Sequence, residues 1–196
     1  MEIIEEKIEK MEKELEEGLE KLSKDIVENN DKVNIEVIRK SSPPTRGKYI
    51  LVVKFKGKWI EEEELWINIE ANFSKDVAIV TINKNKTTIP VEGVIDSLKE
   101  VIKKFIENNE RKDTILTKVE EKTRKILEML NIKYKSLNCF ERDAITYGVL
   151  VEIEQAEGTL TLYYDYQLQL AGIEYSNYGS PENVLNVLKI LAQHIA

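Results

Sequence analysis

A strict alternation of apolar and polar residues runs along residues 159–170, TLTLYYDYQLQL. One side of this segment carries Leu160, Leu162, Tyr164, Tyr166, Leu168 and Leu170, and the other carries Thr159, Thr161, Tyr163, Asp165, Gln167 and Gln169. A period of two predicts a β-strand with one buried face and one solvent face. The sheet that holds this strand must therefore be covered on one face only. We expect Tyr164 and Tyr166 in the core and Tyr163 in solvent.

Apolar residues at helical spacing predict the elements that cover such a sheet. In residues 2–28 the apolar steps average about 3.67 residues, which fits a helix lying on a core better than a coiled coil with its period of about 3.5. Pro90 and Pro181 suit the first turn of further helices, and Asp113 suits the N-cap of another. These helices must supply the cover for the predicted sheets.

The order of the predicted elements repeats. Strands are expected first at 33–37, 48–56, 59–70 and 76–82, and later at 133–140, 144–155, 159–170 and 173–178. The predicted fold class is α+β, a tandem pseudo-repeat in which each half is a helix, a four-stranded antiparallel meander and a helix, with units at 1–109 and 110–196. In topology alone, this order resembles the duplicated saddle of the TATA-binding protein class and the single-sheet folds of secretion chaperones and adaptors. A topology implies no activity.

Composition narrows the classes of protein that the chain can represent. A net charge of −7 disfavours coating nucleic acid by bulk charge, and a single cysteine excludes an internal disulfide and fits a reducing compartment. The longest apolar run, YILVV at 49–53, is too short to cross a bilayer, so we expect a cytoplasmic protein without membrane contact. The high content of charged residues is typical of thermophile proteomes or of AT-rich genomes.

Catalytic and cofactor motifs are weak throughout the sequence. Cys139 has only His194 as a candidate base, and nothing in their spacing brings the two together. The glycines stand singly, so a glycine-rich phosphate loop is absent and we expect no cofactor. Glu152, Glu154 and Asp165 on neighbouring strands are weak candidates for a divalent-metal site, which gives a metal-dependent hydrolase as one alternative.

Exposed aromatic and apolar residues suggest contact with another protein. The interaction candidates on the predicted sheet faces are Trp66, Leu150, Tyr163, Gln167 and Gln169. The first sheet is apolar on both faces, because Ile50 and Val52 alternate with Leu51 and Val53. We expect cover for its second face from the chain itself or from a second copy in a homodimer. The leading hypothesis is a non-enzymatic interaction module, such as an adaptor, a chaperone-like protein or an assembly subunit.

A basic segment offers the other alternative. Residues 39–59 contain no acid and carry Arg39, Lys40, Arg46, Lys48, Lys54, Lys56 and Lys58. With the interleaved rings of Tyr49, Phe55 and Trp59, these cations could hold a nucleic-acid backbone and stack on its bases. Glu61–Glu64 lies just across the predicted turn, however, and could pair with Lys54 or Lys56.

Overall fold

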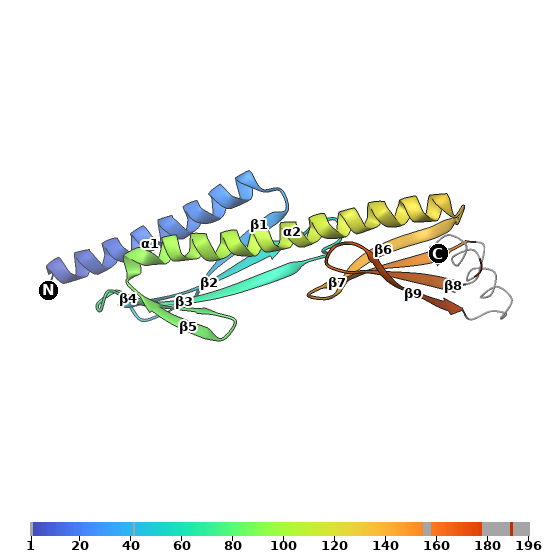
Figure 1. Ribbon diagram of the computed structural model, residues 1–196. Helices are drawn as coiled ribbons and strands as arrows, with labels where there is room; N and C mark the ends of the chain where they lie inside the picture. Colours follow the sequence, from blue (N-terminus) through green and yellow to red (C-terminus); the bar gives the residue numbers. More distant parts are fainter. Residues whose placement is uncertain (1, 41, 155–157, 178–188, 190–196) are drawn as a thin grey trace. The chain divides into compact units, whose positions relative to one another are not determined.

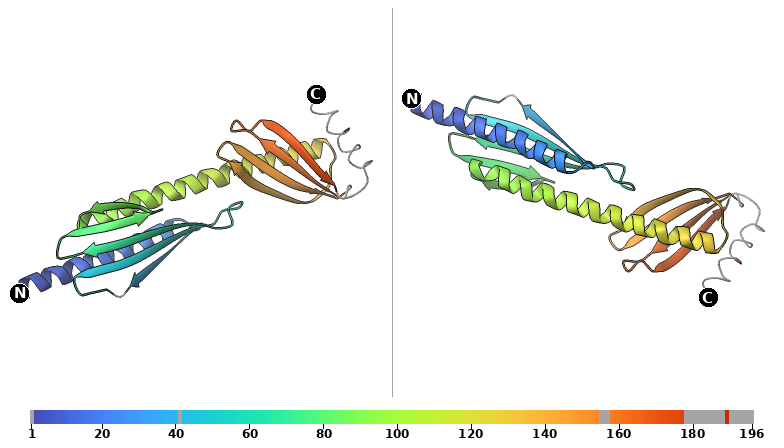
Figure 2. Two further views of the ribbon diagram at one scale, coloured as in Figure 1. Left: turned by 90° about the horizontal axis from the view of Figure 1, so that it is seen from below. Right: turned by 90° about the horizontal axis from the view of Figure 1, so that it is seen from above.

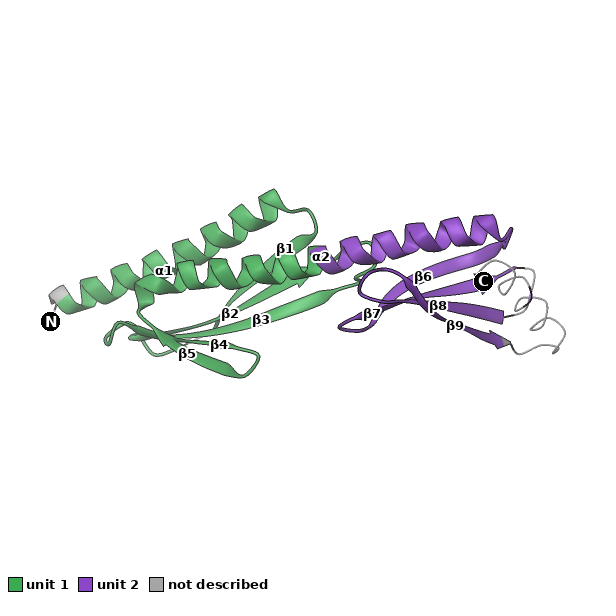
Figure 3. Ribbon diagram, viewed as in Figure 1, with its two compact units in different colours: residues 1–110 green, residues 111–196 purple. Residues whose placement is uncertain are grey.

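The computed structural model describes residues 2–40, 42–154, 158–177 and 189. The chain divides into two compact units, residues 1–110 and 111–196 (Figure 3). The helices and strands are α1 (Glu2–Asn29), β1 (Val33–Lys40), β2 (Arg46–Phe55), β3 (Glu63–Asn72), β4 (Val77–Ile82), β5 (Asn85–Ile89), the short helix η1 (Val91–Gly93), α2 (Val94–Met129), β6 (Tyr134–Asp143), β7 (Thr146–Ile153), β8 (Gly158–Tyr164) and β9 (Leu170–Asn177). This confirms an α+β fold with antiparallel sheets.

The first unit is a two-layer structure. Strands β1 to β5 form an antiparallel sheet in chain order. Helix α1 and the first part of α2 lie on the same face of that sheet (Figures 1 and 2). The core between the layers is made of aliphatic and aromatic side chains, among them Leu15, Leu19, Leu22, Leu51, Val53, Phe55, Ile67, Ile69, Leu98 and Ile102. The predicted helix at 2–28 is therefore confirmed as a helix that lies on a core.

The first sheet has five strands where the sequence pattern predicted four. The polar segment that follows β4 turns back at Asn83 and Lys84, both of which have positive φ. A two-residue turn with this geometry matches the twist of a hairpin. Strand β5 then pairs with β4 and ends at Ile89, and the helical region begins after Pro90. The prediction failed because β5 is an exposed edge strand whose residues, NKTTI, carry no apolar alternation.

The two helices expected around residue 110 are one continuous helix, α2. Asp113, predicted to cap a second helix, lies inside α2 and is buried. Residues 94–147 contain neither glycine nor proline, so nothing in this stretch breaks the helical backbone near residue 110. The prediction of a separate helix that begins at Asp113 is wrong.

The second unit is also a two-layer structure. Strands β6 to β9 form a four-stranded antiparallel sheet in chain order. The part of α2 from residue 111 onward lies on one face of this sheet (Figure 1). The buried side chains on that face come mainly from β7 and β8: Tyr147, Val149, Val151, Ile153, Leu160, Leu162 and Tyr164. The alternation along residues 159–164 therefore predicted the covered face correctly.

The strand expected at 159–170 ends at Tyr164. Asp165 accepts hydrogen bonds on Oδ1 from the backbone N–H groups of Gln167 and Gln169, at 2.9 and 2.8 Å. Leu168 has positive φ, and β9 begins at Leu170. Tyr166 is consequently 67% exposed, and its predicted place in the core is wrong.

The tandem repeat stays a prediction, because the sheets have five and four strands and one helix serves both units. The last predicted helix, after Pro181, lies outside the described residues. Within the described part of the chain, no helix is long and apolar enough to cross a membrane.

Candidate interaction surfaces

The face of the first sheet that points away from α1 and α2, called the open face here, carries an apolar patch. Its apolar members are Ile38, Ile50, Val52, Trp66 and Ile79. Val52 lies between Glu36 and Trp66 in the strand register and is only 2% exposed, whereas Trp66 is 50% exposed. The open face therefore presents the large, half-exposed ring of Trp66 beside the buried side chain of Val52.

Trp66 is held in place by a polar neighbour on its own strand. Its indole Nε1–H donates a hydrogen bond of 2.7 Å to Glu64 Oε2. This bond, together with Lys54 at 3.4 Å from Oε1, lowers the pKa of Glu64 below its ordinary value. The carboxylate therefore stays ionised as an acceptor and fixes the edge of the ring. This hydrogen bond orients the exposed ring.

Several cations of the basic segment have acidic partners on the open face. Lys54 lies 3.7 Å from Glu62 and 3.4 Å from Glu64, and these carboxylates raise its pKa. Lys48 lies 4.0 Å from Glu70 on the facing strand. The pairing of Lys54 with the acids beyond the turn, suggested by the sequence, is thus confirmed. These ion pairs place alternating charges around the apolar patch.

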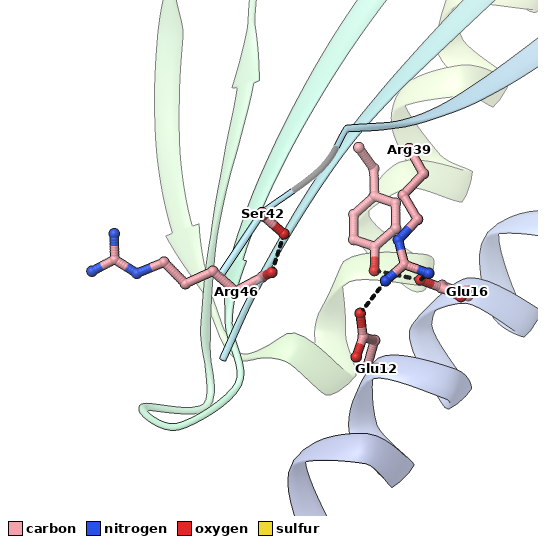
Figure 4. Close-up of polar contacts among 6 residues, drawn as sticks. Glu12, Glu16, Arg39, Ser42 and Arg46 are labelled. Carbon is pink, nitrogen blue, oxygen red and sulfur yellow. Dashed lines mark hydrogen bonds and ion pairs between the residues drawn. The ribbon is translucent and has the colours of Figure 1, made fainter. Parts of the chain in front are cut away.

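Arg39 lies on the other face of the sheet and contacts α1 (Figure 4). Its guanidinium is 2.5 Å from a carboxylate oxygen of Glu12 and 2.7 Å from one of Glu16. Tyr49 Oη donates to the same Glu16 at 3.0 Å. Burial is the main cause that raises the pKa of Tyr49 above its ordinary value, and this hydrogen bond raises it further. Sequence reasoning missed this network because only the packing of α1 brings Glu12 and Glu16 to β1.

The seven basic residues consequently do not share one surface. Strand alternation places Lys40, Arg46, Lys48 and Lys54 opposite to Arg39. Lys56 and Lys58 follow the end of β2, where Lys58 lies 5.3 Å from the ring centre of Trp59. Lys58 covers one face of that ring, which leaves at most the other face for the base stacking that the nucleic-acid alternative requires.

The second sheet also has a face directed away from α2, and Tyr163 lies on it. Tyr163 Oη donates to Glu174 at 2.9 Å, and the guanidinium of Arg142 lies 4.6 Å from the ring centre. Gly148 separates Tyr163 from Phe140 in the strand register, and the Phe140 ring covers the glycine. A glycine in mid-strand was the sequence signal for this close approach. Leu150 is exposed on the same face.

The other candidates of the second unit are dispersed. Gln167 and Gln169 lie in the turn after β8, so they do not extend the face that carries Tyr163. Glu152 pairs with Lys135 at 3.9 Å and lies beside Thr159, whereas Asp165 follows Tyr164 at the opposite end of the β7–β8 pair. The predicted metal site of Glu152, Glu154 and Asp165 is thus not assembled. Among the residues described, no three metal-ligating side chains gather.

Cys139 is buried in β6, facing Val149 across the strand pair. His194, its only candidate base, is not among the residues described. Comparison of the chain with protein-family models and with curated proteins finds no match. The exposed faces of the two sheets are therefore the features from which a function is inferred.

Proposed function

We propose that this protein is a non-catalytic protein-interaction module whose contact surface is the open face of the β1–β5 sheet. The half-exposed Trp66 ring carries the proposal. Tryptophans at the centre of a contact surface contribute a large share of binding energy, and energetically weaker polar contacts surround them. The arrangement of Trp66 beside Val52, with the Lys54 and Lys48 ion pairs nearby, has this composition.

The fixed orientation of Trp66 supports the same proposal. A side chain that is already held in one rotamer loses less conformational entropy on binding than a free one. The hydrogen bond to Glu64 supplies this restraint. The partner expected for such a surface is a protein segment with an apolar centre and charged residues of both signs around it.

A photo-crosslinking experiment tests this proposal. A benzoyl-phenylalanine in place of Asn68, which is exposed on the open face beside Trp66, should capture the partner in cells. The same residue at the exposed position of Glu92, in η1, is the matched control. Crosslinks at position 68 that are absent at 92 and lost on Trp66→Ala are expected. Equal crosslinks at both positions, or crosslinks that survive Trp66→Ala, would contradict the proposal.

The face that carries Leu150 and Tyr163 is proposed as a second contact surface. The tandem repeat also remains a proposal, and it is supported by an antiparallel sheet with a helix on one face in each unit. Binding of nucleic acid through residues 39–59 stays the weaker alternative, because Lys48, Lys54 and Arg39 have acidic partners. Its test is affinity for single-stranded DNA that falls steeply with salt and is lost in Lys54→Glu/Lys56→Glu. No arrangement among the described residues favours a metal-dependent hydrolase.

A further inference from the structure

The edge strands of the two sheets differ in how they resist pairing with another strand. Natural edges are blunted by shortness, by lysines or by bulges. Strand β5 is short and polar and contains Lys86. Strand β6 has two register irregularities, and the pairing of β9 has one. Strand β1, by contrast, pairs with β2 along Val33–Lys40 without any shift.

The backbone groups of β1 point in two alternating directions. The Lys32 carbonyl accepts a hydrogen bond from the Lys56 N–H. The even-numbered residues of β1 therefore direct their backbone N–H and C=O groups toward β2. The Ile35 carbonyl instead accepts from Ser23 Oγ of α1 at 3.4 Å. The odd-numbered residues therefore direct their N–H and C=O groups to the free edge. Val37 and Arg39 offer these groups to an added strand.

A groove of about 470 Å³ runs between α1 and this edge. Its walls include Leu19, Ser23 and Val27 on α1, and Ile35 and Val37 on β1. A strand added to β1 would place every second side chain on the helix side of the sheet. The groove has room for such side chains, so the packing of α1 does not close the edge.

We propose that two copies of the chain pair along β1, antiparallel, with Ile38 facing Ile38 of the second copy across a two-fold axis. In this register Glu36 faces Lys40 of the second copy, and the symmetry repeats that ion pair. Val37 and Arg39 exchange backbone hydrogen bonds across the new ladder. Ile38 and Ile50 are neighbours on the open face, so the apolar patch would continue from one copy into the other.

The alternative symmetric registers are less complementary. Centring the axis on Glu36 sets Glu36 against itself, and centring it on Arg39 sets Arg39 against itself; like charges directly opposite are destabilising. Centring it on Val37 sets Glu36 against Ile38, which leaves the charge without a partner. Centring it on Ile35 sets Val33 against Val37 of the second copy, and the Val33 N–H already donates to the Asn30 carbonyl at 3.2 Å.

Cysteine crosslinking tests both the pairing and its register. Facing residues of a non-hydrogen-bonded pair have Cα atoms about 4.5 Å apart, within the range that a disulfide spans. Under mild oxidation, Ile38→Cys should form a disulfide-linked dimer faster than Glu36→Cys or Val37→Cys. Asn68→Cys, exposed on the same face but away from β1, is the control and should form no disulfide-linked dimer. A maximum at position 36 or 37 would overturn the register.

The molecular mass by light scattering gives the second readout. The wild-type protein should approach twice 22.7 kDa as its concentration rises. Val37→Pro removes an N–H that only the added strand uses and should restore the monomer, while Val37→Thr keeps that N–H and should remain dimeric. Far-UV circular dichroism verifies that both variants are folded. A wild-type mass of 22.7 kDa at every concentration, with no preferred crosslink, would overturn the proposal. Trp66→Ala should leave the mass unchanged, so failure here is separable from failure of the proposed function.

Discussion

A buried pair of hydroxyl groups in the second unit allows a quantitative test of the packing between α2 and its sheet. Thr123 Oγ1 lies 2.7 Å from Tyr164 Oη and 2.9 Å from the Val119 carbonyl oxygen. The side chains of Thr123 and Tyr164 are 0% and 1% exposed. A threonine hydroxyl has one hydrogen, and the Val119 carbonyl can only accept it. Tyr164 must therefore donate its hydrogen to Thr123.

This assignment makes the two single substitutions unequal. Tyr164→Phe removes a donor and leaves Thr123 bonded to Val119, so it should cost about 1 kcal/mol of unfolding free energy. Thr123→Val leaves the Tyr164 hydroxyl buried without an acceptor and should cost about 2 to 3 kcal/mol. In the double variant no polar group is stranded, so its cost should be close to that of Tyr164→Phe alone. The resulting coupling energy has a magnitude of about 2 to 3 kcal/mol.

Hydrogen exchange of the β7 and β8 amides measures the unfolding free energy of this unit. Thr117→Val is the matched control, because Thr117 Oγ1 donates to the Asp113 carbonyl in the same helix at 2.9 Å. It should change stability by less than about 1 kcal/mol, which separates the loss of a bond within the helix from the loss of the acceptor for Tyr164. Costs of the two substitutions that add within about 0.5 kcal/mol would refute the assigned direction of the bond.

Three further predictions concern stability. Burial raises the pKa of Tyr164 and Tyr49, so the folded state favours the neutral form of each side chain. The free energy of unfolding should therefore be unaffected by these groups below about pH 10 and should fall above it. In urea titrations from pH 8 to 11, Tyr164→Phe should make that fall shallower. In Gly148→Val the new Cβ would lie 2.3 Å from Phe140 Cζ, so about 1 to 3 kcal/mol should be lost and Phe140→Ala should restore part of it; equal midpoints would contradict this contact. Leu98→Ala, in the core of the first unit, should cost about 3 kcal/mol in urea unfolding, whereas the exposed Met129→Ala should stay within about 0.5 kcal/mol.

The parts of the fold that depend on local periodicity were predictable from the sequence. The stripe of α1 and the alternation in β7 and β8 follow from which side chains must be buried. Beyond Tyr164 the alternation predicted a strand where the chain makes a turn at Asp165. The prediction failed because Tyr164 and Tyr166, on either side of that turn, continue the alternating pattern. Strand β5 was missed since its stability comes from pairing with β4, and a pairing leaves no apolar signature in an exposed edge strand.

The candidate surfaces, like the fold, were predictable only where they follow from local periodicity. The exposure of Trp66 follows from its place between the buried Leu65 and Ile67. The partners of Arg39 do not follow from any local pattern, because Glu12 and Glu16 reach it only through the packing of α1 on β1. The dispersal of the metal candidates depends on the β7–β8 register, which the sequence leaves open.

The proposed pairing along β1 and the proposed binding at Trp66 would use different groups of the same sheet. The pairing would use edge backbone groups of Val37 and Arg39, while the proposed contact surface would use side chains of β2 and β3. Paired copies would nevertheless bring two open faces into one continuous surface, because Ile38 borders both the edge and Ile50. A partner that touches both copies would then bind with an affinity that depends on the dimer, whereas a partner of one copy would not. Crosslinking yield at position 68 in Val37→Pro therefore separates the two arrangements: loss of yield indicates that the dimer is the binding unit, and an unchanged yield indicates that each sheet binds alone.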